Sequence, residues 1–73
     1  MKQYKITIKV NDSKFAAGNV FADRLVIKEG RSSSKIQYID LFLGDKMVYG
    51  HASLGKVEVI EENGDTFEII ING

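Results

Sequence analysis

Apolar and polar residues alternate along most of this chain with a period of two, a pattern that predicts β-strands. The alternation is cleanest at Tyr4–Val10, where apolar side chains occupy the even positions and lysines or threonine the odd ones. Turn residues separate it from further segments of the same kind. The expected strands are Tyr4–Val10, Val20–Glu29, Lys35–Leu43, Lys46–Leu54, Lys56–Glu61 and Thr66–Asn72.

Residues 13–17 are the only place where a helix would fit. Asp12 or Ser13 would cap a single turn and Gly18 would end it, with a plain loop as the alternative. The predicted fold is therefore all-β: a small antiparallel meander of about six strands, as a curved sheet or a small barrel. At most one short helical turn is expected, near residues 13–17.

The segment Lys35–Tyr49 holds the densest apolar run, and Gly44-Asp45 within it predicts a two-residue hairpin loop. Such a loop pairs Phe42 with Met47 and Leu41 with Val48. One face would then be a core face, carrying Ile39, Leu41, Leu43, Val48 and Ala52. The opposite face would carry an aromatic, partly polar patch that we expect to bind a partner: Tyr38, Asp40, Phe42, Met47, Tyr49 and His51.

Two other irregularities are expected. Asp23 and Arg24 interrupt an apolar segment, which favours a β-bulge near them. At Asn63-Gly64, a three-residue loop of residues 62–64 would place the apolar residues of both flanking strands on one face. That loop would also put Glu58 opposite Glu68, a pair of like charges.

The chain has 73 residues, which indicates one domain spanning residues 1–73. A domain of this size buries only about 60% of its unfolded surface and is marginally stable alone. It has no cysteine and a single histidine, so neither a disulfide nor a zinc site is expected to stabilise it. We therefore expect self-association to supply the stability, and no cofactor or metal is indicated.

The net charge is zero, but the charges are unevenly distributed. Residues 1–36 hold eight Lys or Arg against three acids, and residues 37–73 hold two lysines against seven acids. One interpretation is pairing between basic and acidic strands of one sheet. The other is a dipolar surface with a basic side for an anionic partner.

The N-terminal ten residues contain neither the uninterrupted apolar stretch nor the cleavage site of a signal peptide. The apolar runs are far shorter than the roughly 20 residues of a membrane span. We therefore expect a cytoplasmic protein with no membrane partner.

No phosphate-binding glycine loop, zinc-ligand spacing or nucleophile elbow is present. His51 is the one side chain suited to act as a base near neutral pH, and a triad with Ser53 and Asp40 could be drawn on a strand surface. Strand surfaces seldom make the water-excluding cleft that catalysis needs. We therefore expect that this protein is not an enzyme.

Two binding hypotheses remain. The aromatic patch suits a protein interface, or it could stack the bases of a single-stranded nucleic acid. A serine-rich loop with basic flanks could contact phosphates, although it is also typical of a solvated hairpin loop: Lys28, Arg31, Ser32, Ser33 and Lys35. Zero net charge favours the protein partner. We therefore expect a small non-enzymatic protein-interaction module that self-associates, with a single-stranded nucleic-acid-binding β-barrel as the alternative.

Overall fold

The computed structural model describes residues 1–30 and 35–73, and these residues form seven β-strands in two sheets. The all-β prediction is confirmed, and the two curved sheets do not close into a barrel. The strands are β1 (Lys2–Val10), β2 (Ser13–Ala22), β3 (Arg24–Glu29), β4 (Ile36–Leu43), β5 (Lys46–Leu54), β6 (Glu58–Asn63) and β7 (Thr66–Asn72).

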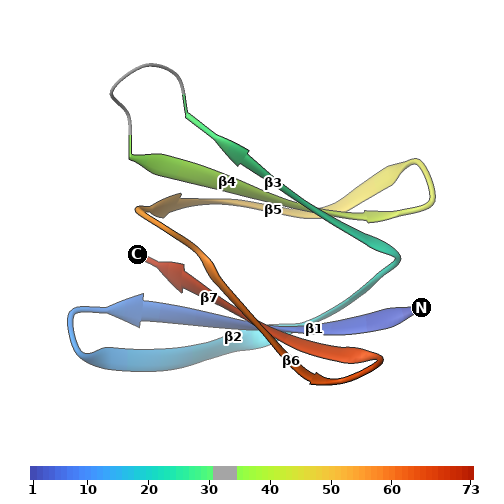
Figure 1. The fold of residues 1–73 in the computed structure, drawn as a ribbon, viewed down its shortest axis with the longest axis horizontal. Helices are drawn as coiled ribbons and strands as arrows, with labels where there is room; N and C mark the ends of the chain where they lie inside the picture. The colour runs from blue at the N-terminus through green and yellow to red at the C-terminus, as the bar shows by residue number, and fades with distance from the viewer. Residues whose placement is uncertain (31–34) are drawn as a thin grey trace.

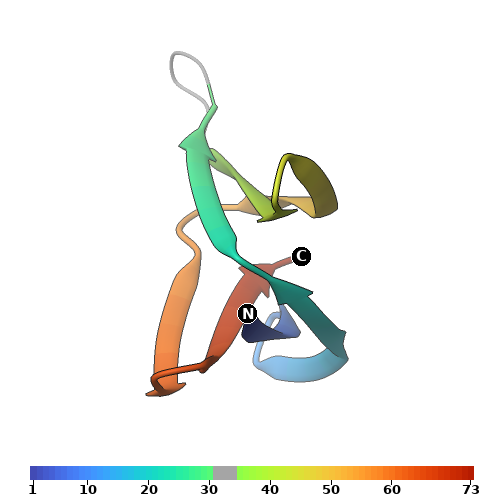
Figure 2. The same ribbon diagram turned by 90° about the vertical axis from the view of Figure 1, so that its right-hand side faces the viewer.

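The two sheets lie as layers, one over the other (Figures 1 and 2). The four-stranded sheet has the order β2-β1-β7-β6, and the three-stranded sheet has the order β3-β4-β5. Neighbouring strands are antiparallel except for β1 and β7, which pair in parallel although they come from opposite ends of the chain. This long-range pairing departs from a simple meander and fixes both ends of the chain in one sheet.

The helical turn considered for residues 13–17 is wrong, because these residues belong to β2. Asn11 takes a positive φ of 55°, and Asn11 and Asp12 make a tight turn from β1 directly into β2. Asparagine tolerates this conformation better than most residues. The chain thus gains a hairpin, and with it a seventh strand.

The expected strand Val20–Glu29 is split at Asp23, where the chain leaves one sheet and enters the other. The Asp23 N–H donates to the carbonyl oxygen of Phe42 over 2.8 Å. Its carboxylate accepts from the N–H of Gly44 over 3.1 Å. A polar residue inside an apolar segment therefore marks a corner between the sheets, where a bulge was expected.

The core lies between the layers. Ile39 and Leu41 of β4 pack there with Ile69 and Ile71 of β7, and all four have 0% of their surface exposed. Tyr4 stacks on Phe67 at one end of this core, with the ring centres 5.3 Å apart. Burial raises the pKa of the Tyr4 hydroxyl above its usual value.

The β6–β7 connection confirms the expected side-chain faces but not the expected register. Val59 lies opposite Ile69, on the core side. The register shifts between Glu61 and Asn63, and this shift puts the side chains of β6 and β7 on the faces expected from a three-residue loop. Glu58 lies opposite Ile70, so the predicted pairing of Glu58 with Glu68 is wrong.

The basic and acidic halves of the chain meet in the four-stranded sheet, where β1 lies beside β7. Lys5 Nζ is 2.8 Å from Glu62 Oε2, and the Thr7 hydroxyl donates to Glu68 over 2.8 Å. The hydrogen bond to Glu62, and then its charge, raise the pKa of Lys5. These contacts support pairing between basic and acidic strands within one sheet.

Candidate interaction surface

The β4–β5 hairpin turns at Gly44-Asp45 as expected, and Phe42 lies opposite Met47. Beyond that pair the register shifts by one residue, because Val48 is an extra residue in β5. Leu41 therefore lies opposite Tyr49, and the predicted pairing of Leu41 with Val48 is wrong. A β-bulge of this kind reverses the face of every residue that follows it in the strand.

The bulge divides the predicted aromatic patch between two faces. Tyr49 and His51 lie opposite the buried residues Leu41 and Ile39, so their side chains are on the core side of the sheet. There the two rings stack with centres 6.4 Å apart, and burial raises the pKa of Tyr49. The expectation that all six residues form one patch is therefore wrong.

Tyr38, Asp40, Phe42 and Met47 remain together on the outer face, away from the core. Strand parity brings further residues to this face that were not among the predicted site residues. The outer face of the three-stranded sheet consists of Arg24, Val26, Lys28, Ile36, Tyr38, Asp40, Phe42, Met47, Gly50, Ala52 and Leu54.

This outer face is mainly apolar and accessible. Tyr38, Met47 and Leu54 are 44%, 54% and 64% exposed. Gly50 has no side chain, and the Met47 Sδ and Cε atoms lie 3.6 Å from the position that a Cβ would take there. An exposed apolar surface of this kind typically marks a contact site.

The charges of the outer face lie on β3 and β4 and are partly engaged. The Arg24 guanidinium lies over the Phe42 ring, 4.4 Å from its centre. Lys28 Nζ is 3.9 Å from the Asp40 carboxylate. Both contacts leave Tyr38 and Met47 exposed.

The outer face of the four-stranded sheet provides an internal comparison. It carries mostly charged and polar side chains, among them Lys5, Lys9, Glu58 and Glu68, with the exposed apolar residues Phe21 and Ile60 between them. Such a surface is typical of a sheet that has one face on the core and the other in water. On the three-stranded sheet the charged side chains of the outer face are limited to Arg24, Lys28 and Asp40, and the rest of that face is apolar apart from the Tyr38 hydroxyl. This larger apolar share distinguishes it as the candidate interaction surface.

The residues predicted to contact anions are dispersed. Lys28 belongs to the outer face, and Lys35 lines a hollow at the opposite end of the hairpin from Gly44. Arg31, Ser32 and Ser33 lie outside the described residues. The predicted anion contact is therefore untested as a set.

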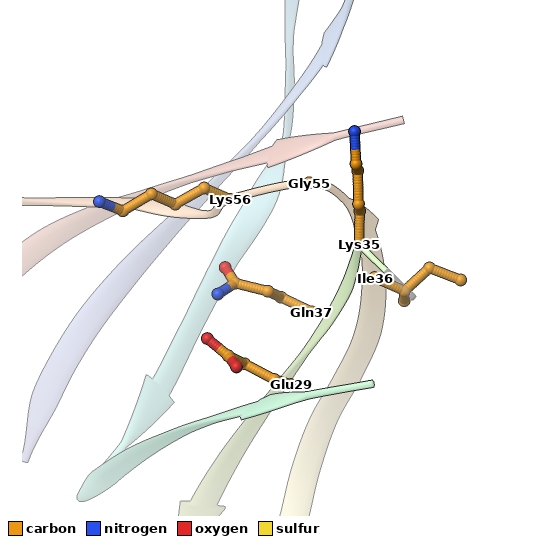
Figure 3. A pocket seen from close by; sticks show the side chains of 6 residues that line it. All are labelled: Glu29, Lys35, Ile36, Gln37, Gly55 and Lys56. Carbon is orange, nitrogen blue, oxygen red and sulfur yellow. The ribbon is translucent and has the colours of Figure 1, made fainter. Parts of the chain in front are cut away.

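That hollow, of about 490 Å³, opens between the end of β3 and the connection from β5 to β6 (Figure 3). Gln37 holds the connection by accepting a hydrogen bond from the Val57 N–H over 2.7 Å. The remaining side chains that line it are Glu29, Lys35, Ile36 and Lys56. The charged groups among them are exposed, so the hollow is an open surface feature.

The three residues of the conceivable catalytic triad do not meet. Asp40 is on the outer face, whereas His51 and Ser53 are on the core side of β5. The Ser53 hydroxyl is buried and accepts a hydrogen bond from the Asn72 N–H over 2.9 Å, which ties β5 to β7. Ser53 thus has a structural role in this arrangement.

Residues 1–30 and 35–73 contain no cluster of three His, Cys, Asp or Glu side chains that could hold a metal ion. In the same residues no helix has the length and apolar character needed to cross a membrane. Comparison of the chain with protein-family models, curated proteins and solved structures finds no match.

Proposed function

We propose that this protein is a non-enzymatic protein-interaction module whose contact surface is the outer face of the three-stranded sheet. The observation that carries the proposal is the contrast between the two outer faces. The outer face of the four-stranded sheet is mostly charged and polar, whereas that of the three-stranded sheet is mostly apolar, with Tyr38, Met47 and Leu54 exposed. Aromatic residues and methionine are enriched at protein interfaces.

The proposed partner is another protein or a second copy of this chain. Arg24 and Phe42 would form an ordered contact at the end of this face near the hairpin turn, because they already stack on one another. Arginine and tyrosine are common among the residues that dominate binding energy. The proposal includes a cytoplasmic location, which suits a chain without cysteines for stabilising disulfides.

Differential recovery of partners on immobilised protein tests this proposal. The test variant is Tyr38→Ser/Met47→Ser, and the control is Ile60→Ser, which removes an exposed apolar side chain from the outer face of the other sheet. Truncated hot spots cost about 2 kcal/mol or more, roughly thirtyfold in affinity. We expect the test variant, and not the control, to lose the bound protein. Equal recovery by both variants contradicts the proposal.

One observation favours a second candidate, binding of single-stranded nucleic acid. Tyr38 and Phe42 share a sheet face with Arg24 and Lys28, and aromatic rings beside cations are typical of base-stacking surfaces. Asp40 between the rings disfavours a phosphate backbone. Anisotropy of a labelled oligonucleotide tests this: binding that falls steeply with salt supports nucleic acid, and no binding at low salt excludes it.

A further inference from the structure

β2 forms one edge of the four-stranded sheet and carries much less charge than β6, the other edge of that sheet. Its ten residues include a single charged side chain, Lys14, whereas β6 at the opposite edge carries three glutamates in six residues. Phe15 and Phe21 of β2 are 57% and 56% exposed. Natural sheets usually protect a long edge strand with charge, because its free backbone groups can pair with another strand.

The side chains of β2 follow a pattern that is symmetric about its centre. The register of β1 with β2 shifts between Ile6 and Thr7, leaving Ala17 as an extra residue. On the N-terminal side of this bulge, Lys14 and Ala16 point outward and Phe15 inward. On the C-terminal side, Asn19 and Phe21 point outward, whereas Gly18 and Val20 point inward.

This symmetry makes β2 complementary to itself. In an antiparallel pair of two β2 strands centred between Ala17 and Gly18, Ala16 lies opposite Asn19 of the second copy. Lys14 lies opposite Phe21 of the second copy, and Phe15 lies opposite Val20 of the second copy. Every pair has both side chains on the same face, as paired strands require. Without the extra residue each of these pairs would be split between faces.

We propose that β2 pairs with β2 of a second copy, making a two-fold dimer in which the two four-stranded sheets become one continuous sheet. The pairing satisfies the free backbone groups and covers both exposed phenylalanines, one with a valine and one with a lysine side chain. The two Lys14 ammonium groups lie seven residues apart, roughly 23 Å, well beyond the screening length. A two-fold interface is closed, so association stops at the dimer.

This inference is independent of the proposed function, because it uses an edge of the other sheet. It also gives that function a consequence: a dimer through β2 would present two copies of the outer face of the three-stranded sheet. Two linked contact surfaces increase the avidity for a partner that has repeated sites.

Charge variants on the outward positions test the register by sedimentation equilibrium from about 1 to about 500 µM, a range suited to a modest interface. Ala16→Lys/Asn19→Lys places lysine opposite lysine at two symmetric positions of the dimer. Ala16→Glu/Asn19→Lys places glutamate opposite lysine at the same positions. Thermal melts followed by circular dichroism at low concentration test whether both variants fold.

We expect the wild-type mass to rise from 8.2 kDa toward twice that value over this range. The Lys/Lys variant should raise the dissociation constant by about tenfold or more, and the Glu/Lys variant should restore it. Tyr38→Ser/Met47→Ser should leave it within about twofold, since those residues lie on the other sheet. A wild-type monomer at every concentration overturns the inference. A dimer that is disrupted only by Tyr38→Ser/Met47→Ser also overturns it, because that result would assign self-association to the three-stranded sheet.

Discussion

Leu41 and Val48 were both expected on the core face of the hairpin, and the structure separates them. Leu41 has no exposed surface and lies between Leu25 and Tyr49. Val48 is the extra residue of the bulge and is 37% exposed. Comparing the stability lost in Leu41→Ala with that lost in Val48→Ala therefore tests whether the bulge exists.

Leu41→Ala removes three buried carbon atoms, which at about 0.8 kcal/mol each lose roughly 2.4 kcal/mol of transfer free energy. The cavity left between the sheets adds to this, so we expect a total loss of about 3–4 kcal/mol. Domains are stable by about 0.05–0.15 kcal/mol per residue, which is roughly 4–11 kcal/mol for this chain. Leu41→Ala thus removes about a quarter or more of the stability.

Val48→Ala should cost less than about 1 kcal/mol, since much of the side chain is already in water. Urea unfolding followed by circular dichroism gives both values at one low protein concentration, with the slope of the transition as a check on two-state behaviour. Equal losses for the two variants, or a larger loss for Val48→Ala, would show that the hairpin is regular and that Tyr49 faces outward.

Two further results are expected from unfolding measurements. Gly44→Ala should lose about 1–2 kcal/mol because Gly44 has a φ of 62°, whereas Gly50→Ala, whose added carbon would meet its neighbours at 3.5 Å or more, should change stability by less than about 0.5 kcal/mol. Equal effects would exclude strain at the turn. The raised pKa values of Tyr4, Tyr49 and Lys5 mean that the folded state holds these protons to higher pH than the unfolded chain. The contribution of these groups to folding stability is complete below about pH 10 and is lost as the pH rises further. The Tyr4→Phe variant should therefore lose less stability between about pH 9 and 11.5 than the wild type. An identical pH dependence of the two proteins would argue against burial of the Tyr4 hydroxyl.

Local patterns predicted the strands of the hairpin well and its register only in part. The turn at Gly44-Asp45 and the pair of Phe42 with Met47 follow from turn chemistry. The bulge does not, because Val48 and Tyr49 are adjacent apolar residues and either could face the core. Packing of Tyr49 against the core decides between them, and that depends on the other sheet.

The errors near the N-terminus have a similar cause. Asn11, Asp12 and Ser13 suit both a helix cap and a tight turn. The turn is favoured once β1 has a neighbour on each side, and one of these is β7, from the other end of the chain. A local pattern does not contain that parallel pairing.

The candidate surface was found in part by the same reasoning. Tyr38, Asp40, Phe42 and Met47 share a face because β4 is regular from its start to the hairpin turn. Tyr49 and His51 were misplaced because they follow the bulge. The sequence analysis missed Val26, Ile36 and Leu54 as site residues. Their strands carry apolar side chains at both odd and even positions, which indicated a partner but not the face that the partner covers.

Site-specific photo-crosslinking tests the contact surface most directly. A photoreactive phenylalanine analogue replaces Met47 on the outer face of the three-stranded sheet, and in a separate control it replaces Ile60 on the four-stranded sheet. These positions are comparably exposed, at 54% and 44%. In nuclease-treated extracts of the cells that make this protein, we expect a discrete protein adduct from position 47 and none from position 60. Equal adduct yields from both positions, or adducts from position 60 alone, would contradict a contact surface on the three-stranded sheet.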